Sequence, residues 1–465
     1  MKFIRLREYD WLVSEKASRY TQKKLKSKGA KTIPEEAFER LRSVDHIHRP
    51  AFGDTKGKPR TLLSWNDQSA QARQWVGVLQ AGDVSIEVVP KVSRRSTDAD
   101  SIIQGKSVLM GMLAYTKEMS TRFKGAALLR NDDAPLHEVF IRLFAENLAS
   151  ELRRGIPRGY VTRQEQLTAV RGRPLVSAQI RQARGALTPI WCEHDEYLGD
   201  TPLARALLAA CHIAKRRTRE LRAQRALRDC IRQLDGATHV QLTSQALSRV
   251  VLDRQTSRFE QALQFCHLLL EDRSPSVQAG PAHGFAFAFD MNAIYESFVE
   301  RFIALEVLPN LNATLPTGQE IIMGAQGGAT TQYIFTRRLD SKQRLLLKPD
   351  LLFTLLEKNK PPRRFVIDTK WKEIETKNGD PVSRADLYQM YAYMEEYGCQ
   401  RVMLLYPGLD NTYNHGGYTM NKDSSENARE VLVESLTITG DPRELLHKEA
   451  LAKRFTRMLH KAFTL

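Results

Sequence analysis

Short apolar runs rich in β-branched residues mark the first hundred residues, and a helical period replaces them in the middle of the chain. Trp75–Gly82 and Val84–Val92 flank a short turn, which is typical of a β-hairpin, and Pro90 should end the second strand. Over residues 136–152, apolar side chains recur every three or four positions, as on one face of a helix. The pattern predicts a further long helix over residues 202–230.

The C-terminal third contains two apolar runs joined by a polar turn. We expect a strand-like run over Leu345–Leu356 and a second strand, Phe365–Ile367, that leads directly into Asp368. A helix is expected before these runs, over residues 291–305. Another should open at Ser383, a suitable N-cap, and precede a buried strand.

These patterns predict a multidomain α/β protein of 465 residues, a length that allows two or three domains. A Pro-, Gly- and Ser-rich segment, Arg273–Gly284, is the best candidate for a domain boundary. We expect a β-rich N-terminal domain over residues 1–125 and a mainly helical middle region over residues 126–275. A C-terminal domain of mixed strands and helices should follow over residues 280–465.

The charge balance favours a polyanionic partner. The chain has 70 Lys and Arg against 54 Asp and Glu, a net charge of +16. Each cation placed against a phosphate releases a counterion, so nucleic acid is the favoured partner. Charge alone leaves other readings open, because basic proteins also bind acidic partners.

Composition excludes several classes of protein and site. No apolar run reaches the ~18–20 residues that span a bilayer, and the charged N-terminus lacks the apolar core of a signal peptide, so we expect no membrane contact and a cytoplasmic location. The five cysteines show no CxxC spacing and are expected to be buried free thiols. Gly53–Pro59 only superficially resembles a phosphate-binding loop, since Pro59 replaces the required Ser or Thr.

The main candidate for chemistry is the set Asp350, Asp368 and Lys370. Alternation along the second strand puts Asp368 and Lys370 on one face, and pairing of the two strands can bring Asp350 alongside. Two carboxylates suit Mg²⁺, with Mn²⁺ as an alternative, and a nearby ammonium can orient water or neutralise charge on a phosphate. The alternative is a surface hairpin whose charged residues merely flank its exposed face.

Three further residues are weaker candidates. Gln389 and Tyr393 are spaced i, i+4 and share a helix face that could point at the metal site. A tyrosine-rich stripe is also typical of a simple core. Upstream, Glu296 could add a third carboxylate as a metal ligand, with Glu300 as its competitor on the same helix, although either could be a solvent-exposed side chain.

These motifs, in their setting, resemble the PD-(D/E)xK nuclease superfamily, in its branch with a QxxxY helix. The wider chain resembles the McrC family, the nuclease subunits of McrBC-type modification-dependent restriction systems. The resemblance extends in order from about residue 75 to 410 and is carried by these segments: Ile86–Val92, Leu136–Gly155, Tyr160–Leu175, Trp191–Ala210, Met291–Val299, Lys348–Phe353, Val366–Trp371 and Asp386–Tyr393.

The resemblance implies a division of labour. Residues 280–465 would form a restriction-endonuclease-like domain, a mixed sheet flanked by helices, with Asp350 and Asp368 as metal ligands and Lys370 as the catalytic lysine. A separate McrB-like AAA+ GTPase hexamer would recognise and translocate double-stranded DNA that carries modified cytosine. The chain would dock on it through its N-terminal part, stimulate GTP hydrolysis and cut.

Two other functions stay open at this point. One is a catalytically silent assembly subunit that keeps the nuclease fold as a scaffold for DNA binding. The other is a nuclease that acts without a motor, as in DNA repair.

Overall fold

The computed structural model describes most of the chain, and its described residues form two compact units. One unit comprises Met1–His46, Phe52–Asp133 and Pro281–Leu465, and the other comprises Ile47–Ala51 and Ala134–Gly280. Among the described residues, no helix is long and apolar enough to cross a membrane. The described ranges are 2–47, 61–91, 99–116, 134–182, 189–270, 284–325, 331–336, 338, 342–372, 382–408, 414–420, 428–438 and 445–463.

Some sequence-based expectations lie outside these ranges. The loop Gly53–Pro59 and most of the segment Arg273–Gly284 belong to the residues that the structure does not describe. The same holds for the expected domain boundaries near residues 125 and 275.

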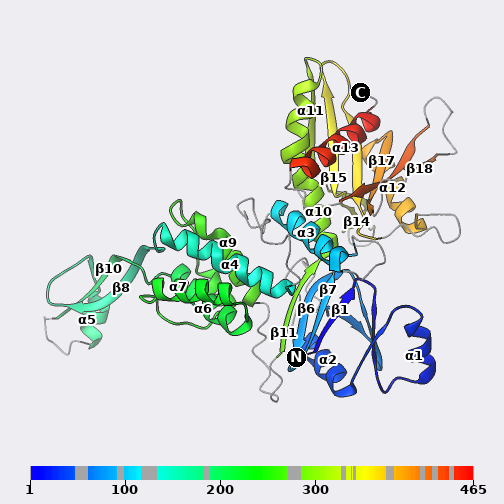
Figure 1. The fold of residues 1–465 in the computed structure, drawn as a ribbon. Coiled ribbons are helices and arrows are strands. Elements are labelled where there is room, and N and C mark those ends of the chain that lie inside the picture. The colour runs from blue at the N-terminus through cyan, green and yellow to red at the C-terminus, as the bar shows by residue number, and fades with distance from the viewer. Residues whose placement is uncertain are drawn as a thin grey trace. The chain divides into compact units, whose positions relative to one another are not determined.

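The first unit contains a four-stranded sheet that joins three strands of the first 90 residues to β11 (Gly284–Asp290). Its strands lie side by side in the order β1 (Lys2–Arg7), β7 (Val84–Val89), β6 (Trp75–Ala81) and β11 (Gly284–Asp290) (Figure 1). The β6–β7 pair confirms the predicted hairpin, and Gly82 at its turn has a φ of 61°, which favours glycine. Since β1 runs parallel to β7, the carboxyl ends of both strands meet at one edge.

A second four-stranded sheet, with shorter strands, and three helices complete the N-terminal part of this unit. The sheet has the order β3-β2-β5-β4, and apolar side chains of both sheets and of the second helix share one core. The elements are β2 (Trp11–Ser14), α1 (Arg19–Lys26), β3 (Lys31–Ile33), α2 (Glu35–Ile47), β4 (Leu63–Trp65), β5 (Ser69–Ala72) and α3 (Ala99–Tyr115).

The C-terminal part of the same unit contains a mixed six-stranded sheet. Its order is β12-β15-β16-β17-β19-β18, with β16, β17 and β19 parallel and the outer pairs antiparallel. The chain is thus a mixed α/β protein, as expected. The strands are β12 (Gln319–Ala325), β15 (Leu351–Glu357), β16 (Arg363–Thr369), β17 (Arg401–Gly408), β18 (Asn414–Thr419) and β19 (Glu430–Thr437).

The expected continuous run over Leu345–Leu356 is wrong in one respect. It forms two strands in different sheets, β14 (Gln343–Leu347), which pairs with β13 (Gln332–Thr336), and β15. The break falls at residues 348–350, where Pro349 has no N–H to donate to a ladder. Asp350 therefore lies at the entry of β15 and not within a strand.

Helices cover the two faces of this sheet (Figure 1). Val366 and Leu404 pack in one cluster with side chains of α12 (Arg384–Tyr397), whose N-cap is Ser383, as predicted. The next residue back along β16, Phe365, points the opposite way, and its ring lies 6.0 Å from that of Phe463 in α13 (Leu445–Phe463). The helix expected over residues 291–305 continues as α10 (Met291–Phe302), a π-helical turn (Ile303–Val307) and α11 (Leu308–Thr314).

The second unit is mainly helical and carries a three-stranded sheet in the order β8-β10-β9. The helix α4 confirms the predicted stripe over residues 136–152. The elements are α4 (Leu136–Arg153), β8 (Gly159–Leu167), β9 (Arg173–Pro174), α5 (Val176–Gln182), β10 (Ile190–Leu198), α6 (Pro202–Arg217), α7 (Leu221–Gln233), α8 (Ser244–Ser248), a 3₁₀ turn (Ser257–Phe259) and α9 (Glu260–Leu270).

The single long helix expected over residues 202–230 is wrong, because the chain breaks between α6 and α7. Thr218 is extended, with φ −96° and ψ 141°. The Glu138 carboxylate of α4 accepts a hydrogen bond from the Thr218 hydroxyl and another from the Arg219 amide at 2.9 Å. A tertiary partner thus replaces helical carbonyls at the break. The five cysteines are buried and free, as predicted.

The sheet that carries β16 and β17 should depend strongly on its apolar packing. We predict that Leu404→Ala lowers the free energy of unfolding by ~2–5 kcal/mol, because Leu404 is 0% exposed and truncation leaves a cavity. The matched control Leu356→Ala changes the same atoms on β15, where the side chain is 40% exposed, and should cost about 0.5 kcal/mol. Urea denaturation of both variants checks this, and equal losses would contradict the described packing.

Candidate functional site

Strand pairing brings Asp350 and Asp368 together. Leu351 pairs with Ile367 in the antiparallel β15–β16 ladder, so Asp350 and Asp368 are opposite each other one position further along. Asp350 is held there by Thr369, whose amide and hydroxyl each donate a hydrogen bond to Asp350 Oδ2 at 2.7 Å. The two carboxylates therefore converge at the edge where β16 ends.

The Asp368 carboxylate is buried and ion-paired. Its residue is 2% exposed, and Lys370 Nζ lies 2.5 Å from Oδ2. Burial and the charge of Asp350 raise the pKa of Asp368 from 3.8 to about 7. Burial alone would lower the pKa of Lys370, but the charges of Asp368 and Asp350 outweigh it and raise that pKa. The low exposure of Asp368 contradicts the alternative of a surface hairpin with exposed charges.

Gln389 and Tyr393 of α12 close this side of the site. Gln389 Oε1 accepts a hydrogen bond from Lys370 Nζ at 3.0 Å, and Gln389 Nε2 donates to Asp368 Oδ1 at 3.2 Å. The Tyr393 hydroxyl accepts from Gln389 Nε2 at 2.9 Å and donates to the Lys348 carbonyl at 3.1 Å. The i, i+4 pair therefore contacts both residues of the ion pair, as its spacing suggested.

Glu296 approaches from α10. Burial and the charge of Asp350 raise the pKa of Glu296 from 4.5 to about 8, with further contributions from Asp368 and Glu300, while Lys348 opposes them. Glu296 is thus close enough to both aspartates for their charges to raise its pKa. The charge of Glu300 contributes to the raised pKa of Glu296.

Sequence reasoning missed several residues of this site. Thr369 fixes Asp350, and the Lys348 carbonyl receives the Tyr393 hydroxyl. Asp386, at the start of α12, is ion-paired with Lys372 and hydrogen-bonded to Ser383. Thr369, Lys348 and Lys372 adjoin the two aspartate motifs in the sequence, and that adjacency is the signal that could have found them.

The carboxylates of Asp350 and Asp368 suit a hard cation such as Mg²⁺, but they do not surround it by themselves. Asp368 Oδ2 is buried, and the Lys370 ammonium lies 2.5 Å from it. Within the described residues, no three His, Cys, Asp or Glu side chains form a group that could hold a metal ion by themselves. Mg²⁺ is usually bound by one or two carboxylates together with waters and substrate phosphate oxygens. Asp350 and Asp368 would supply the carboxylates of such a site.

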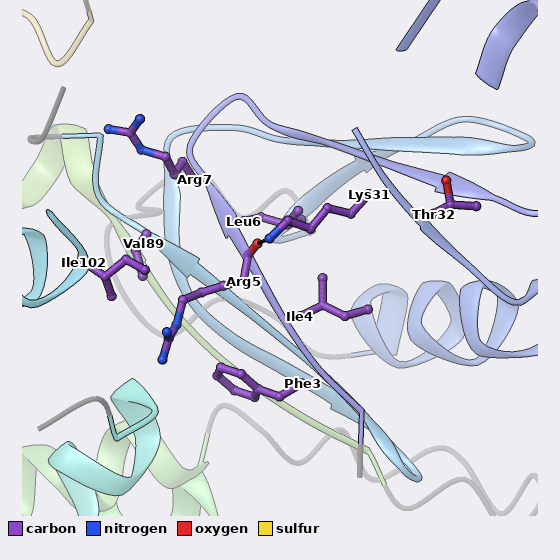
Figure 2. A pocket seen from close by; sticks show the side chains of 9 residues that line it. All are labelled: Phe3, Ile4, Arg5, Leu6, Arg7, Lys31, Thr32, Val89 and Ile102. Atoms are coloured by element: carbon purple, nitrogen blue, oxygen red, sulfur yellow. Dashed lines mark hydrogen bonds between the residues drawn. The ribbon is translucent and has the colours of Figure 1, made fainter. Parts of the chain in front are cut away.

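A separate cavity of about 430 Å³ lies along β1 (Figure 2). Its lining includes Arg5, Arg7 and Lys31 together with apolar side chains such as Phe3 and Ile102. None of the sequence-predicted site residues lines it, and its lining contains no carboxylate. It therefore lacks the ligands for a metal-dependent reaction, and the aspartate cluster is the better candidate for chemistry.

Two chains in solved structures from Thermococcus gammatolerans match this chain. A chain in a half-complex from a tetradecameric assembly of Thermococcus gammatolerans McrB AAA+ hexamers with bound McrC matches at a TM-score of 0.64 and 20% identity, covering 98% of this chain and 100% of that one. A chain of the T. gammatolerans McrBC complex matches at a TM-score of 0.45 and 24% identity, over 66% of this chain and 88% of that one. The first likeness shows a shared fold. No curated protein matches the chain.

The sequence profile of a known family supplies the identification. The family described as McrBC 5-methylcytosine restriction system component matches residues 70–407. That range includes the aspartates, the lysine and the Gln–Tyr helix described above. Because the match spans well over half of the chain, the protein belongs to the McrBC 5-methylcytosine restriction system component family.

Proposed function

We propose that the chain is the metal-dependent DNA endonuclease subunit of an McrBC-type restriction system, and that its C-terminal sheet is a PD-(D/E)xK nuclease core. The observation that carries this proposal is the buried Asp368–Lys370 ion pair facing Asp350. A lysine and two carboxylates that converge in this way are the groups that metal-assisted phosphodiester hydrolysis requires.

Asp350 and Asp368 would hold Mg²⁺, or Mn²⁺ in its place. Asp368 supports this assignment because its Oδ2 is buried, and because burial and the neighbouring carboxylates raise its pKa and that of Glu296. An excess of negative charge at one point is relieved by a bound cation. When bound, the cation would polarise the phosphate and lower the pKa of a water molecule. Glu296 is the weaker third candidate.

Lys370 would neutralise charge on the phosphate, and Gln389 and Tyr393 would hold Lys370 in position. Lys370 keeps its proton, since the surrounding carboxylates raise its pKa, and its ammonium is thus suited to stabilise negative charge that develops on the phosphate. Gln389 fixes the position of that ammonium through its hydrogen bond to Nζ. Tyr393 in turn fixes Gln389 and the strand entry at Lys348.

The family match and the similar structure support a substrate and a partner for this chain. Its description as a 5-methylcytosine restriction component supports double-stranded DNA with modified cytosine as the substrate. The similar structure is an assembly of McrB AAA+ hexamers with bound McrC, which supports an AAA+ GTPase hexamer as the partner of this chain. We assign base recognition and translocation to that partner, and stimulation of GTP hydrolysis and cleavage to this chain.

Lys370→Ala tests the catalytic assignment. We predict a loss of about 100- to 1000-fold in the rate of DNA cleavage, because one preorganised cation for the transition state is removed. The rate is measured with the purified chain, its AAA+ partner, GTP, Mg²⁺ and DNA that contains 5-methylcytosine. The control Lys360→Ala removes a lysine that is 64% exposed, and it should cleave normally.

The same assay separates the alternatives. Both variants should keep the fold and the stimulation of GTP hydrolysis. Cleavage by Lys370→Ala at the wild-type rate would contradict the assignment. Stimulation of GTP hydrolysis by a wild-type chain that never cleaves would favour the silent assembly subunit, and cleavage without partner or GTP would favour a motor-independent nuclease.

A second prediction concerns pH and metal removal. The raised pKa values of Asp368, about 7, and Glu296, about 8, mean that the folded chain binds more protons than the unfolded chain between the ordinary and the raised values. These groups should therefore make the metal-free protein less stable as pH rises through that range. Mg²⁺ competes with those protons, so its effect on Tm should grow between about pH 5 and pH 8.

Asp368→Asn should reduce this dependence, because it removes the contribution of Asp368 and leaves that of Glu296. We expect the variant to have a higher Tm than the wild type when both are metal-free at pH 8, and a smaller rise in Tm with Mg²⁺. Asp83→Asn, which changes a side chain that is 71% exposed, serves as the control and should behave as the wild type. A Mg²⁺ effect that is independent of pH, or is unchanged in Asp368→Asn, would contradict the proposed ligand.

A further inference from the structure

The residue after the proposed catalytic lysine is held by the N-terminal part of the chain. Trp371 is 3% exposed, and its indole N–H donates to the Glu8 carboxylate, at 2.8 Å to Oε1 and 3.1 Å to Oε2. Its backbone carbonyl accepts a hydrogen bond from Lys91 Nζ at 3.1 Å. Side chain and backbone of Trp371 are therefore both fixed by residues about 280 positions or more away in the sequence.

Glu8 and Lys91 are placed for this role by the N-terminal sheet. Each follows the end of one of two parallel strands, Glu8 after β1 and Lys91 shortly after β7. The Lys91 amide donates to Glu8 Oε2 at 3.0 Å, and the Glu8 amide donates to the Val89 carbonyl at 3.2 Å. We name Glu8, Lys91 and Trp371 the Trp371 anchor.

Two of the three residues of the Trp371 anchor are charged, and burying a charge is costly. Glu8 and Lys91 are each 4% exposed, and an ionised group out of water is tolerated only where hydrogen bonds satisfy it. Lys91 Nζ also lies 4.7 Å from the centre of the Tyr9 ring and 5.6 Å from that of Trp371, which favours the ammonium. Both side chains hydrogen-bond Trp371, the neighbour of Lys370 in the sequence.

The same sheet is also connected to α10, the helix that carries Glu296. Its strand β11 runs directly into α10, which carries Glu296, and Met291 at the start of α10 donates to the Gln74 carbonyl at 3.0 Å. Tyr295, the neighbour of Glu296, lies with its ring 5.2 Å from that of Trp371. The N-terminal sheet thus supports the segments that carry Glu296 and Lys370.

We propose that Glu8 and Lys91 are positioning residues for cleavage, which act by fixing Trp371 and thereby the place of Lys370. The inference rests on the proposed nuclease function. Lys370 is just beyond β16, where its own backbone amide makes one bond, to the Leu405 carbonyl at 2.9 Å. Its ammonium must nevertheless meet Asp368 at 2.5 Å and Gln389 at 3.0 Å. A fixed neighbour supplies the additional restraint that this geometry requires.

Lys91→Met tests the proposal, with Lys106→Met as the matched control. Lys106 is a second buried lysine of the same unit, with its side chain 2% exposed and its ammonium 3.1 Å from Glu87 Oε1, so its replacement likewise removes a buried ammonium and its contacts. Two quantities are measured for both full-length variants. They are the single-turnover cleavage rate at saturating DNA, with Mg²⁺ and the AAA+ partner, and the hydrogen exchange of a peptide that spans residues 365–372.

We expect Lys91→Met to cut about 100-fold more slowly, since a misplacement of about 1 Å costs that much. Its affinity for DNA should be unchanged, and the 365–372 peptide should exchange faster than in Lys106→Met. Trp371→Phe keeps an aromatic ring but removes the pyrrole half of the indole with its N–H donor, and it should change both quantities in the same direction. It gives the same test if Lys91→Met does not fold.

Cleavage and exchange equal to those of Lys106→Met would overturn the positioning role and leave the proposed function standing. A wild-type chain that cleaves no DNA would instead refute the proposed function. In that case exchange alone decides: faster exchange in Lys91→Met than in Lys106→Met supports the anchor, and equal exchange overturns it.

Discussion

The burial of one carboxylate, that of Asp368, is the constraint on which the rest of the site depends. A charge that is 2% exposed must be compensated, and three side chains contact it from two directions. Lys370 does so from the end of the same strand, and Gln389 and Tyr393 do so from α12. Compensation remains incomplete, since Asp350 opposes it and the pKa of Asp368 stays raised. Residual negative charge of this kind is what a divalent cation can neutralise.

This constraint explains why the unit combines both ends of the sequence. Strands β15 and β16 carry the aspartates. The residues after β16 and the start of α10 are both attached to the sheet β1-β7-β6-β11, through the Lys91–Trp371 hydrogen bond and through β11. That sheet is completed by β11, which is almost 200 residues after β7 in the chain. Non-local pairing of this type lets one rigid element support both flanks of a site.

Local features of this structure could be predicted from the sequence, and non-local ones could not. The β6–β7 hairpin, helix α4 and the Ser383 cap follow from patterns within a few residues. The break at Pro349 was missed because apolar residues lie on both sides of the short segment Lys348–Asp350. The break at Thr218 was missed because its cause, Glu138, is on another helix. Gln389 and Tyr393 were found by helical spacing, whereas Glu8 and Lys91 are linked to Trp371 by tertiary contact alone.

The most direct test of the account is to locate the metal. A crystal of the chain with a DNA duplex and Mn²⁺ would be measured at a wavelength where manganese scatters anomalously. The account predicts an anomalous peak that both Asp350 and Asp368 coordinate, at about 2.0–2.2 Å from their oxygens. A peak elsewhere, or none between these carboxylates with DNA bound, would contradict it.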